Sequence, residues 1–318
     1  MRRAIAVAAS ARVVAHPNPW VGAVIGEHVG ATSAPGGAHA EATALASAGA
    51  AASGATLYTT LEPCTDFPGK RTGSCAQAIV GAGVARVVIG ITDPDERVAG
   101  QGVAALRAAG IDVEVGVAAD EVRAQLAPYV THRTTGRPYV LLKLAASLDG
   151  RTAAPDGSSR WITGDAARAD AHRLRAESDA VLVGAGTVRT DDPSLTVRHV
   201  EGPDPRRVVL GKAPAGAKVH PCDELDGDLG AILDRLGAEG VVQVLVEGGA
   251  AVAADFHRAN LVDRYVVYLA PVLFGGDDGR GLFAGAGAAT IDDVWRGRIV
   301  ETTQLGDDLK VVLERKAA

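Results

Sequence analysis

The sequence of 318 residues is poor in cysteine and has no long apolar run. Three cysteines, with no charged leader followed by an apolar segment, do not fit a secreted disulfide framework, so we expect a reducing, cytoplasmic location. The apolar runs are broken by Gly, Asp or Arg well short of the ~18 residues that a membrane-spanning helix needs. We therefore expect no membrane partner.

The sequence also has no excess of positive charge and few aromatic residues. There are 32 Lys and Arg residues against 38 Asp and Glu, and aromatic residues make up 4% of the chain. Proteins that bind nucleic acids normally present a basic face, and those that bind single strands stack bases on aromatic side chains. This composition favours a small-molecule substrate and disfavours a nucleic-acid partner.

A His-x-Glu sequence followed by two cysteines carries the clearest chemistry. His39 and Glu41 precede Cys64 and Cys75. One imidazole and two thiolates supply three ligands for tetrahedral zinc and leave the fourth position for water, as in catalytic zinc sites. Glu41 is then placed to carry a proton to a leaving amine, as in zinc-dependent base deaminases. The alternative is a surface histidine and two unrelated buried cysteines, since ten residues replace the usual two between the cysteines.

Hydrophobic periodicity in the first half predicts alternating helices and strands. We expect helices over 1–14, 39–52, 75–82 and 102–109, a charged helix from residue 120, strands over 20–25, 55–60, 84–91 and 111–117, and a glycine-rich loop over 26–38. The helix that begins at Cys75 would lower the pKa of that thiol through its positive end. The alternation predicts a three-layer α/β sandwich.

Length and pattern indicate a second domain. We place the boundary in the polar segment that ends at Pro138, giving domains 1–138 and 139–318. In the second domain we expect strands over 139–146, 180–183, 207–210, 242–246 and 265–269, and helices over 165–177 and 250–259. This pattern predicts an independent α/β domain.

Two strand ends in the second domain carry glycines, at Gly184 and at Gly248-Gly249. A strand, a glycine turn and a helix can bring backbone N–H groups to a phosphate, although a tight turn without a ligand fits equally well. Arg189 stands where a Gly-x-Gly-x-x-Gly fingerprint needs glycine, which disfavours an ordinary Rossmann domain. Arg175 and Arg198 are candidates for binding a phosphate, or else solvated surface charges.

A series of motifs in one order covers almost the whole chain. They are Pro17-Asn18-Pro19, His39-Ala40-Glu41, Leu61-Glu62-Pro63-Cys64, Lys143-Leu144, Ser147-Leu148-Asp149-Gly150-Arg151, Trp161-Ile162-Thr163, Asp191-Asp192-Pro193 and Glu247-Gly248-Gly249. Together they closely resemble the family of bifunctional riboflavin-biosynthesis deaminase-reductases.

The resemblance implies a cytidine-deaminase-like sandwich followed by a dihydrofolate-reductase-like α/β domain, in a homo-oligomer. The first domain would deaminate 2,5-diamino-6-(5-phosphoribosylamino)pyrimidin-4(3H)-one, and the second would reduce the ribosyl side chain to ribityl with NADPH. By position, His39, Cys64 and Cys75 would bind Zn²⁺ and Glu41 would be catalytic. NADPH contacts would be Ala145, Trp161, Thr187, Asp191, Gly211, Gly249, Ala250, Ala251, Val252, Ala253, Ala254 and Asp255. Substrate contacts would be Asn18, Lys143, Ser159, Arg175, Leu195, Arg198 and Glu247.

One segment departs from the family pattern. The loop from Cys64 to Cys75 is two residues longer than the family's usual loop, and Asp66 stands nearest the place of its histidine. A paralogue of a specialised pathway, with another deaminase substrate or with one active half, is therefore an alternative function. A non-catalytic or nucleic-acid-binding module is a further alternative, which the acidic composition opposes.

Overall fold

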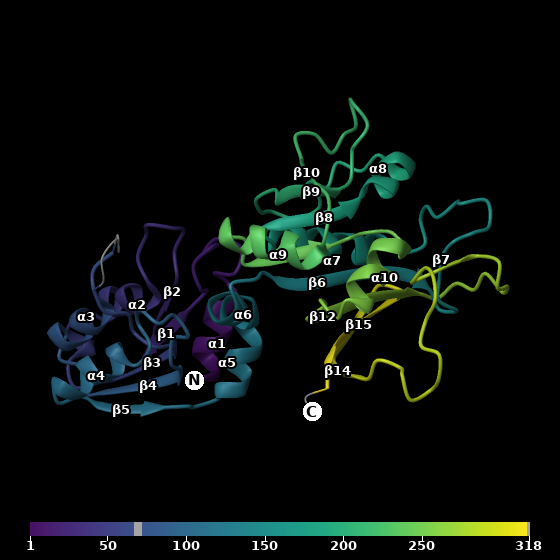
Figure 1. Cartoon of the computed structure of the whole chain (residues 1–318). Coiled ribbons are helices and arrows are strands. Elements are labelled where there is room, and N and C mark those ends of the chain that lie inside the picture. Colours follow the sequence, from purple (N-terminus) through teal and green to yellow (C-terminus); the bar gives the residue numbers. More distant parts are fainter. Residues whose placement is uncertain (67–71, 317–318) are drawn as a thin grey trace. The chain divides into compact units, whose positions relative to one another are not determined.

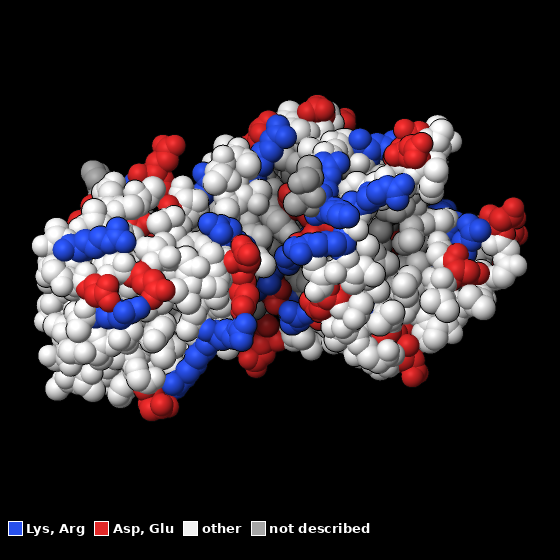
Figure 2. Space-filling model, turned by 90° about the horizontal axis from the view of Figure 1, so that it is seen from below, with Lys and Arg blue, Asp and Glu red and all other residues white. Residues whose placement is uncertain are grey.

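The computed structural model describes residues 1–66 and 72–316 and shows two compact units, Met1–Gly136 and Arg137–Ala318 (Figure 1). Within the described residues, no helix combines the length and the apolar character that crossing a membrane requires. On the face drawn in Figure 2, Lys and Arg side chains are interspersed with Asp and Glu side chains on both units.

The first unit is built on a five-stranded sheet in the order β2-β1-β3-β4-β5. Its helices are α1 (Arg2–Ala9), α2 (Ala40–Ala48) with the 3₁₀ turn η1 (Gly49–Ala52), α3 (Cys75–Gly81), α4 (Gln101–Ala108), α5 (Ala119–Gln125) and α6 (Ala127–Thr135). Its strands are β1 (Gly22–Ile25), β2 (His28–Ala31), β3 (Thr56–Leu61), β4 (Arg86–Ile91) and β5 (Asp112–Val115). β3, β4 and β5 run parallel, whereas β1 is antiparallel to both of its neighbours.

Two glycines show how helices cover both faces of this sheet. A Cβ on Gly22 would lie 2.1 Å from the carbonyl oxygen of Ala4 in α1, and a Cβ on Gly30 would lie 2.1 Å from that of Ala40 in α2. Gly30 pairs with Ala23, the neighbour of Gly22, so the two glycines face opposite sides of the pleated sheet. The helices α1 and α2 therefore lie on opposite faces, and the predicted three-layer sandwich is confirmed.

Most predicted elements of the first unit are confirmed to within two residues at their ends, but three predictions are wrong. The segment 26–38 is not all loop, because β2 forms an edge strand whose mixed residues show no apolar alternation. The first helix ends at Ala9, not at residue 14. The helix from residue 120 is two helices, because Pro128 lies in the first turn of α6, where proline starts a helix but does not continue one.

The second unit contains an eight-stranded sheet in the order β10-β9-β8-β11-β6-β12-β15-β14 and a small pair, β13 and β7. The strands are β6 (Tyr139–Ser147), β7 (Arg151–Ala153), β8 (Ala180–Gly184), β9 (Arg206–Leu210), β10 (Asp223–Leu225), β11 (Gln243–Val246), β12 (Arg264–Ala270), β13 (Arg280–Gly281), β14 (Gly297–Leu305) and β15 (Asp308–Arg315). The helices are α7 (Asp165–Ala176), α8 (Ala185–Asp191), α9 (Leu229–Ala238) and α10 (Ala250–Arg258).

Helices cover both faces of the large sheet as well. Leu142 on β6 packs in one core with Ile232 of α9 and Phe256 of α10. Its neighbour Leu141 packs in another core with Leu174 of α7. The strands and helices predicted for this domain are confirmed, and the sequence interpretation missed α8, α9 and the strands β7, β10, β13, β14 and β15.

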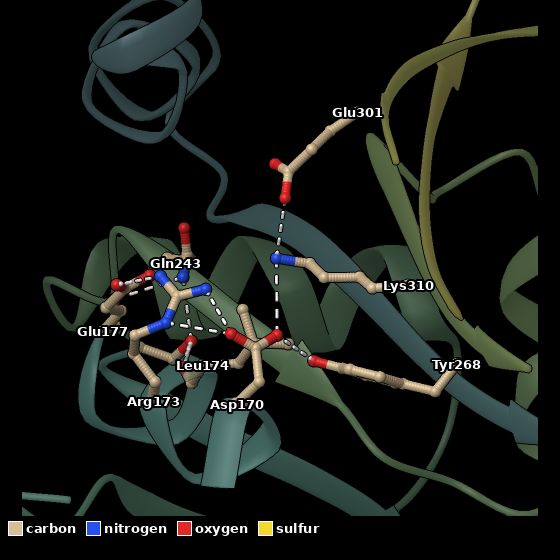
Figure 3. A network of polar contacts seen from close by, with 9 residues as sticks. Asp170, Arg173, Leu174, Glu177, Gln243, Tyr268, Glu301 and Lys310 are labelled. Carbon is tan, nitrogen blue, oxygen red and sulfur yellow. Dashed lines mark hydrogen bonds and ion pairs between the residues drawn. The ribbon is translucent and has the colours of Figure 1, made fainter. Parts of the chain in front are cut away.

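A polar network joins α7 to the sheet (Figure 3). Asp170 accepts a hydrogen bond of 2.6 Å from the hydroxyl of Tyr268, and its carboxylate lies 2.5 Å from Arg173 and 3.3 Å from Nζ of the buried Lys310. Lys310 also pairs with Glu301 at 3.1 Å. This network anchors one side of α7, whereas His172 and Arg175 of the same helix make other contacts.

We expect Asp170→Ala to lower the free energy of unfolding of the second unit by roughly 3–5 kcal/mol, because it leaves a buried lysine and a tyrosine hydroxyl without their shared partner. The measurement is denaturant unfolding. Asp234→Ala, which removes only an exposed partner of Arg137, is the control and should cost at most ~1 kcal/mol. Equal effects of the two substitutions would contradict the role given to the network.

Candidate active sites

Three side chains that are far apart in the sequence converge in the first unit. His39 caps the N-terminus of α2, Cys64 follows the carboxyl end of β3, and Cys75 is the first residue of α3. Nδ1 of His39 lies 3.3 Å from Sγ of Cys64 and 3.4 Å from Sγ of Cys75. The three possible ligand atoms all lie within 4.8 Å of one another. One nitrogen and two sulfurs at this separation fit a tetrahedral zinc ion with one position open.

The surroundings orient these ligands. Nε2 of His39 lies 3.1 Å from the hydroxyl of Thr72, so a proton on Nε2 leaves Nδ1 free to face the two sulfurs. Ser74 caps α3 by accepting a hydrogen bond from the N–H of Gln77 and donates a hydrogen bond of 3.3 Å to the carbonyl of Cys64. Sequence interpretation named neither Thr72 nor Ser74. Residues 67–71 of the longer loop lie outside the described residues.

Glu41 is buried beside this cluster. Its side chain accepts a hydrogen bond of 3.4 Å from the hydroxyl of Thr59, and the residue is 3% exposed. Burial first, and then the negative charge of Cys64, raises the pKa of Glu41 to about 7. A cation held by the three ligands acts in the opposite direction on that pKa. The pKa of Glu41 therefore depends both on its burial and on the charges of the neighbouring metal site.

A cavity of about 360 Å³ opens onto His39, Glu41 and Cys64. Its wall also contains Asn18, the predicted substrate contact. The size suits a small molecule.

The cavity has further polar wall residues that sequence interpretation missed. They are Asp93, Asp95, Arg97, Tyr129 and Arg133. Burial raises the pKa of Asp93 to about 6, and the hydroxyl of Tyr129 donates a hydrogen bond of 2.9 Å to its carboxylate. The Asp-Pro-Asp sequence just after the buried strand β4 could have indicated these wall residues, because ligands bind at the carboxyl ends of parallel strands.

A second cavity, of about 580 Å³, lies in the second unit at the carboxyl ends of β6, β8 and β11. It is lined by ten of the residues predicted to contact cofactor or substrate: Lys143, Ala145, Ser159, Thr187, Asp191, Glu247, Gly249, Ala250, Ala251 and Val252. α10 begins beside it, and the N–H of Gly249 donates a hydrogen bond of 3.1 Å to the hydroxyl of Thr187. The N-terminus of α10 therefore offers backbone N–H groups to a phosphate.

The other predicted residues of this unit do not line that cavity. Gly211 and Asp255 line a neighbouring cavity of about 650 Å³ that shares Val252 with it. Trp161 is 71% exposed, with the guanidinium of Arg168 4.7 Å from its ring centre. The remaining predicted residues lie as follows: Ala253, Ala254 and Leu195 are buried in the core, Arg175 is half-buried and Arg198 is exposed.

Charged groups meet at the floor of the second cavity. Arg175 binds both carboxylate oxygens of Glu247 through one edge of its guanidinium, with Nε at 2.5 Å and Nη2 at 3.0 Å. Burial would raise the pKa of Glu247, but the positive charges of Arg175 and then of Lys143 outweigh it and lower that pKa. Burial lowers the pKa of Lys143. Glu247 is therefore held as a carboxylate beside a lysine at the edge of the cavity.

The fold and the two sites define a class of protein: a zinc-binding deaminase unit joined to a reductase unit with a cavity for a dinucleotide. The family model "Cytidine and deoxycytidylate deaminase zinc-binding region" matches residues 1–91, which include all three possible ligands. The family model "RibD C-terminal domain" matches residues 138–311.

Full-length relatives agree with this class. The chain is 38% identical to the riboflavin biosynthesis protein RibD of Bacillus amyloliquefaciens, over 98% of this chain and 94% of that protein. It is 40% identical to RibD of Mycobacterium tuberculosis, over 94% and 91% of the two chains. The solved structure of Acinetobacter baumannii RibD superposes with a TM-score of 0.91 at 36% identity, over 99% and 98% of the two chains.

A solved Thermotoga maritima protein superposes with a TM-score of 0.88 at 33% identity, over 99% and 97% of the two chains. That protein is described as a diaminohydroxyphosphoribosylaminopyrimidine deaminase/5-amino-6-(5-phosphoribosylamino)uracil reductase. The present chain belongs to the RibD family of riboflavin biosynthesis proteins. It is a bifunctional enzyme of that pathway, with a zinc-binding deaminase domain and an NADPH-dependent reductase domain, which confirms the predicted fold, activities and cofactors.

Proposed function

We propose that residues 1–138 hydrolyse the 2-amino group of 2,5-diamino-6-(5-phosphoribosylamino)pyrimidin-4(3H)-one, and that residues 139–318 then reduce the ribosyl side chain to ribityl. The observation that carries this proposal is the convergence of His39, Cys64 and Cys75 beside a cavity whose wall contains Glu41. The deaminase and reductase activities by which the Thermotoga maritima protein is named support the choice of substrate. We further propose a cytoplasmic homo-oligomer without a nucleic-acid partner.

In the deaminase half, His39, Cys64 and Cys75 would hold zinc. When bound, zinc supplies a Lewis acid that makes water nucleophilic at neutral pH. Glu41 takes the proton of the attacking water and passes it to the departing amine, which leaves as ammonia. Asn18, in the wall of the same cavity, is placed to hydrogen-bond the pyrimidine and orient it toward Glu41.

In the reductase half, NADPH supplies the hydride. The start of α10, with Gly249, would hold the pyrophosphate, and Thr187 and Asp191 line the same cavity. Lys143 and Glu247 also line this cavity, where they orient the sugar for hydride transfer. Arg175 and Arg198 bind the substrate phosphate, with Ser159 and Leu195 completing the substrate surface.

Lowering the pH should stop deamination before it stops reduction. Thiolates and a neutral imidazole are needed to hold zinc, so protonation of these ligands below about pH 5 is expected to release the metal and stop deamination. Reduction uses no metal ligand and should persist longer as the pH falls. The measurement is the rate of each half-reaction between pH 8 and pH 4.5, with recovery after return to pH 8 with zinc. Superimposable pH profiles would count against two independent sites.

The substrate assignment is tested with the authentic pyrimidine phosphate and by rescue of a riboflavin auxotroph. We expect ammonia release by the purified protein and growth of the auxotroph. The second candidate is a paralogue with another deaminase substrate, which the longer loop between Cys64 and Cys75 favours. Failure of rescue by a protein that binds zinc and NADPH would support that candidate.

A further inference from the structure

The helix α7 presents a second set of polar residues, away from the network around Asp170. His172 is 5% exposed, and its Nδ1 accepts a hydrogen bond of 3.1 Å from the backbone N–H of Arg198. The ring of His199 packs edge-on against it, with ring centres 4.6 Å apart. His172 therefore ties α7 to the segment Ser194–Arg198 through the backbone and not through a surface side chain.

The segment Ser194–Arg198 brings two guanidinium groups to one residue. Arg175 donates a hydrogen bond of 3.1 Å to the carbonyl of Thr196, and Arg198 donates one of 2.9 Å to the hydroxyl of the same Thr196. Arg198 also donates to the hydroxyl of Ser194. The positions of both cations thus depend on the path of this short segment.

The two arginines differ in their partners. Arg175 is neutralised by Glu247, whereas no carboxylate of the described residues pairs with the exposed Arg198. Burial first, and then the charges of Arg175 and Arg198, lowers the pKa of His172 to about 4. At neutral pH its ring is therefore uncharged, with the proton on Nε2 and Nδ1 able to accept. Protonation of Nδ1 would remove the acceptor that holds the N–H of Arg198.

We propose that His172 is a positioning residue of the reductase: by holding the backbone of Arg198, it places that guanidinium beside Arg175 to receive the phosphate of the substrate. The inference rests on the proposed function, since it needs a phosphorylated sugar in the second cavity. His172 itself does not touch the substrate. Its effect should therefore appear in the binding of phosphorylated substrate and not in the binding of NADPH.

The test compares His172→Leu with His172→Asn in the full-length protein. Asparagine keeps an acceptor near the place of Nδ1, whereas leucine keeps only bulk. The assay is NADPH oxidation with 5-amino-6-(5-phosphoribosylamino)uracil and with its dephosphorylated form. The KM for NADPH of the same samples serves as the control for an intact reductase unit.

For His172→Leu we expect about a tenfold rise in KM for the phosphorylated substrate, the size of one lost hydrogen bond between Arg198 and the charged phosphate. The value of kcat, the KM for NADPH and the KM for the dephosphorylated substrate should stay within about twofold. His172→Asn should restore most of the loss. An unchanged KM, an equal rise for both substrates, or no rescue by asparagine would overturn the proposal.

A second measurement covers the case in which His172→Leu folds poorly. His172→Gln, which moves the acceptor away from the N–H, is combined with Arg198→Gln. Because His172 acts through Arg198, the substitution His172→Gln should raise the KM for the phosphorylated substrate by less than about twofold when Arg198→Gln is already present. Additive effects of the two substitutions would overturn the proposal. Wild-type protein that reduces neither substrate would instead refute the proposed function, and the inference with it.

Discussion

Glu41→Gln is expected to reduce deamination by about 10²–10⁴-fold, the usual contribution of a general acid-base group. Glutamine keeps the shape of the buried side chain and can still accept the hydrogen bond from Thr59, but it cannot take a proton from water. Zinc binding should survive, because the substitution leaves the three proposed ligands, His39, Cys64 and Cys75, unchanged. Ammonia release from the pyrimidine phosphate is the measurement.

Two controls isolate the role of Glu41. The first is reduction of the already deaminated substrate by the same sample, which should be unchanged because the second unit has its own core and cavity. The second is Glu62→Gln, a buried carboxylate in the wall of the same cavity that accepts hydrogen bonds from three backbone N–H groups. It should lower stability but leave deamination within about tenfold of the wild-type rate. A Glu41→Gln protein that deaminates as fast as the Glu62→Gln protein would refute the proton-carrier role.

Cys75→Ser is expected to remove zinc and deamination together. A serine hydroxyl is not deprotonated at neutral pH, so the substitution leaves only one thiolate and one imidazole for the metal. We expect bound zinc to fall from about one ion per chain to nearly none, while reduction of the deaminated substrate continues. Metal analysis of the purified protein, together with both half-reactions, gives the result.

Cys222→Ser is the matched control for this experiment. Cys222 is the third cysteine of the chain, half-buried in the second unit and outside the group that could hold a metal. Its substitution should leave zinc content and deamination unchanged. Loss of zinc from both variants would show that the metal binds elsewhere, and full zinc in Cys75→Ser would exclude this ligand.

The zinc cluster was predictable because each ligand is marked by local sequence. His39 and Cys75 begin helices and Cys64 follows a buried strand, so each could be placed on a predicted element. The opposite wall of the cavity was not predictable in this way. The contact between Tyr129 and Asp93 joins positions 36 residues apart that no common motif links.

The strands of the second unit were predictable where they contain a short apolar run. β8 and β11 are buried along their whole length, and residues 180–183 and 244–246 are continuous apolar runs, as in central parallel strands. β15 escaped prediction because the charged residues Asp308 and Lys310 occupy buried positions and interrupt its apolar alternation. Lys310 can be buried because Asp170 and Glu301 neutralise it, and Asp170 lies on α7, far from β15 in the sequence.

The pair of Arg175 and Glu247 illustrates the same limit. Arg175 was a phosphate-binding candidate from the sequence and Glu247 a contact implied by the family resemblance, but their contact joins positions 72 residues apart and depends on the parallel pairing of β11 with β6 and β8. Composition and periodicity predict the strands but not which of them are neighbours. The order of strands in the sheet therefore had to come from the structure.

The most direct test of the central claim is the ratio of ammonia released to NADPH oxidised in one reaction with the diaminopyrimidine phosphate. If one chain carries out both steps in sequence, the two amounts should become equal at completion, and omission of NADPH should leave ammonia release intact. Ammonia release without NADPH oxidation, or NADPH oxidation without ammonia, would contradict the claim that both domains act on this substrate in turn.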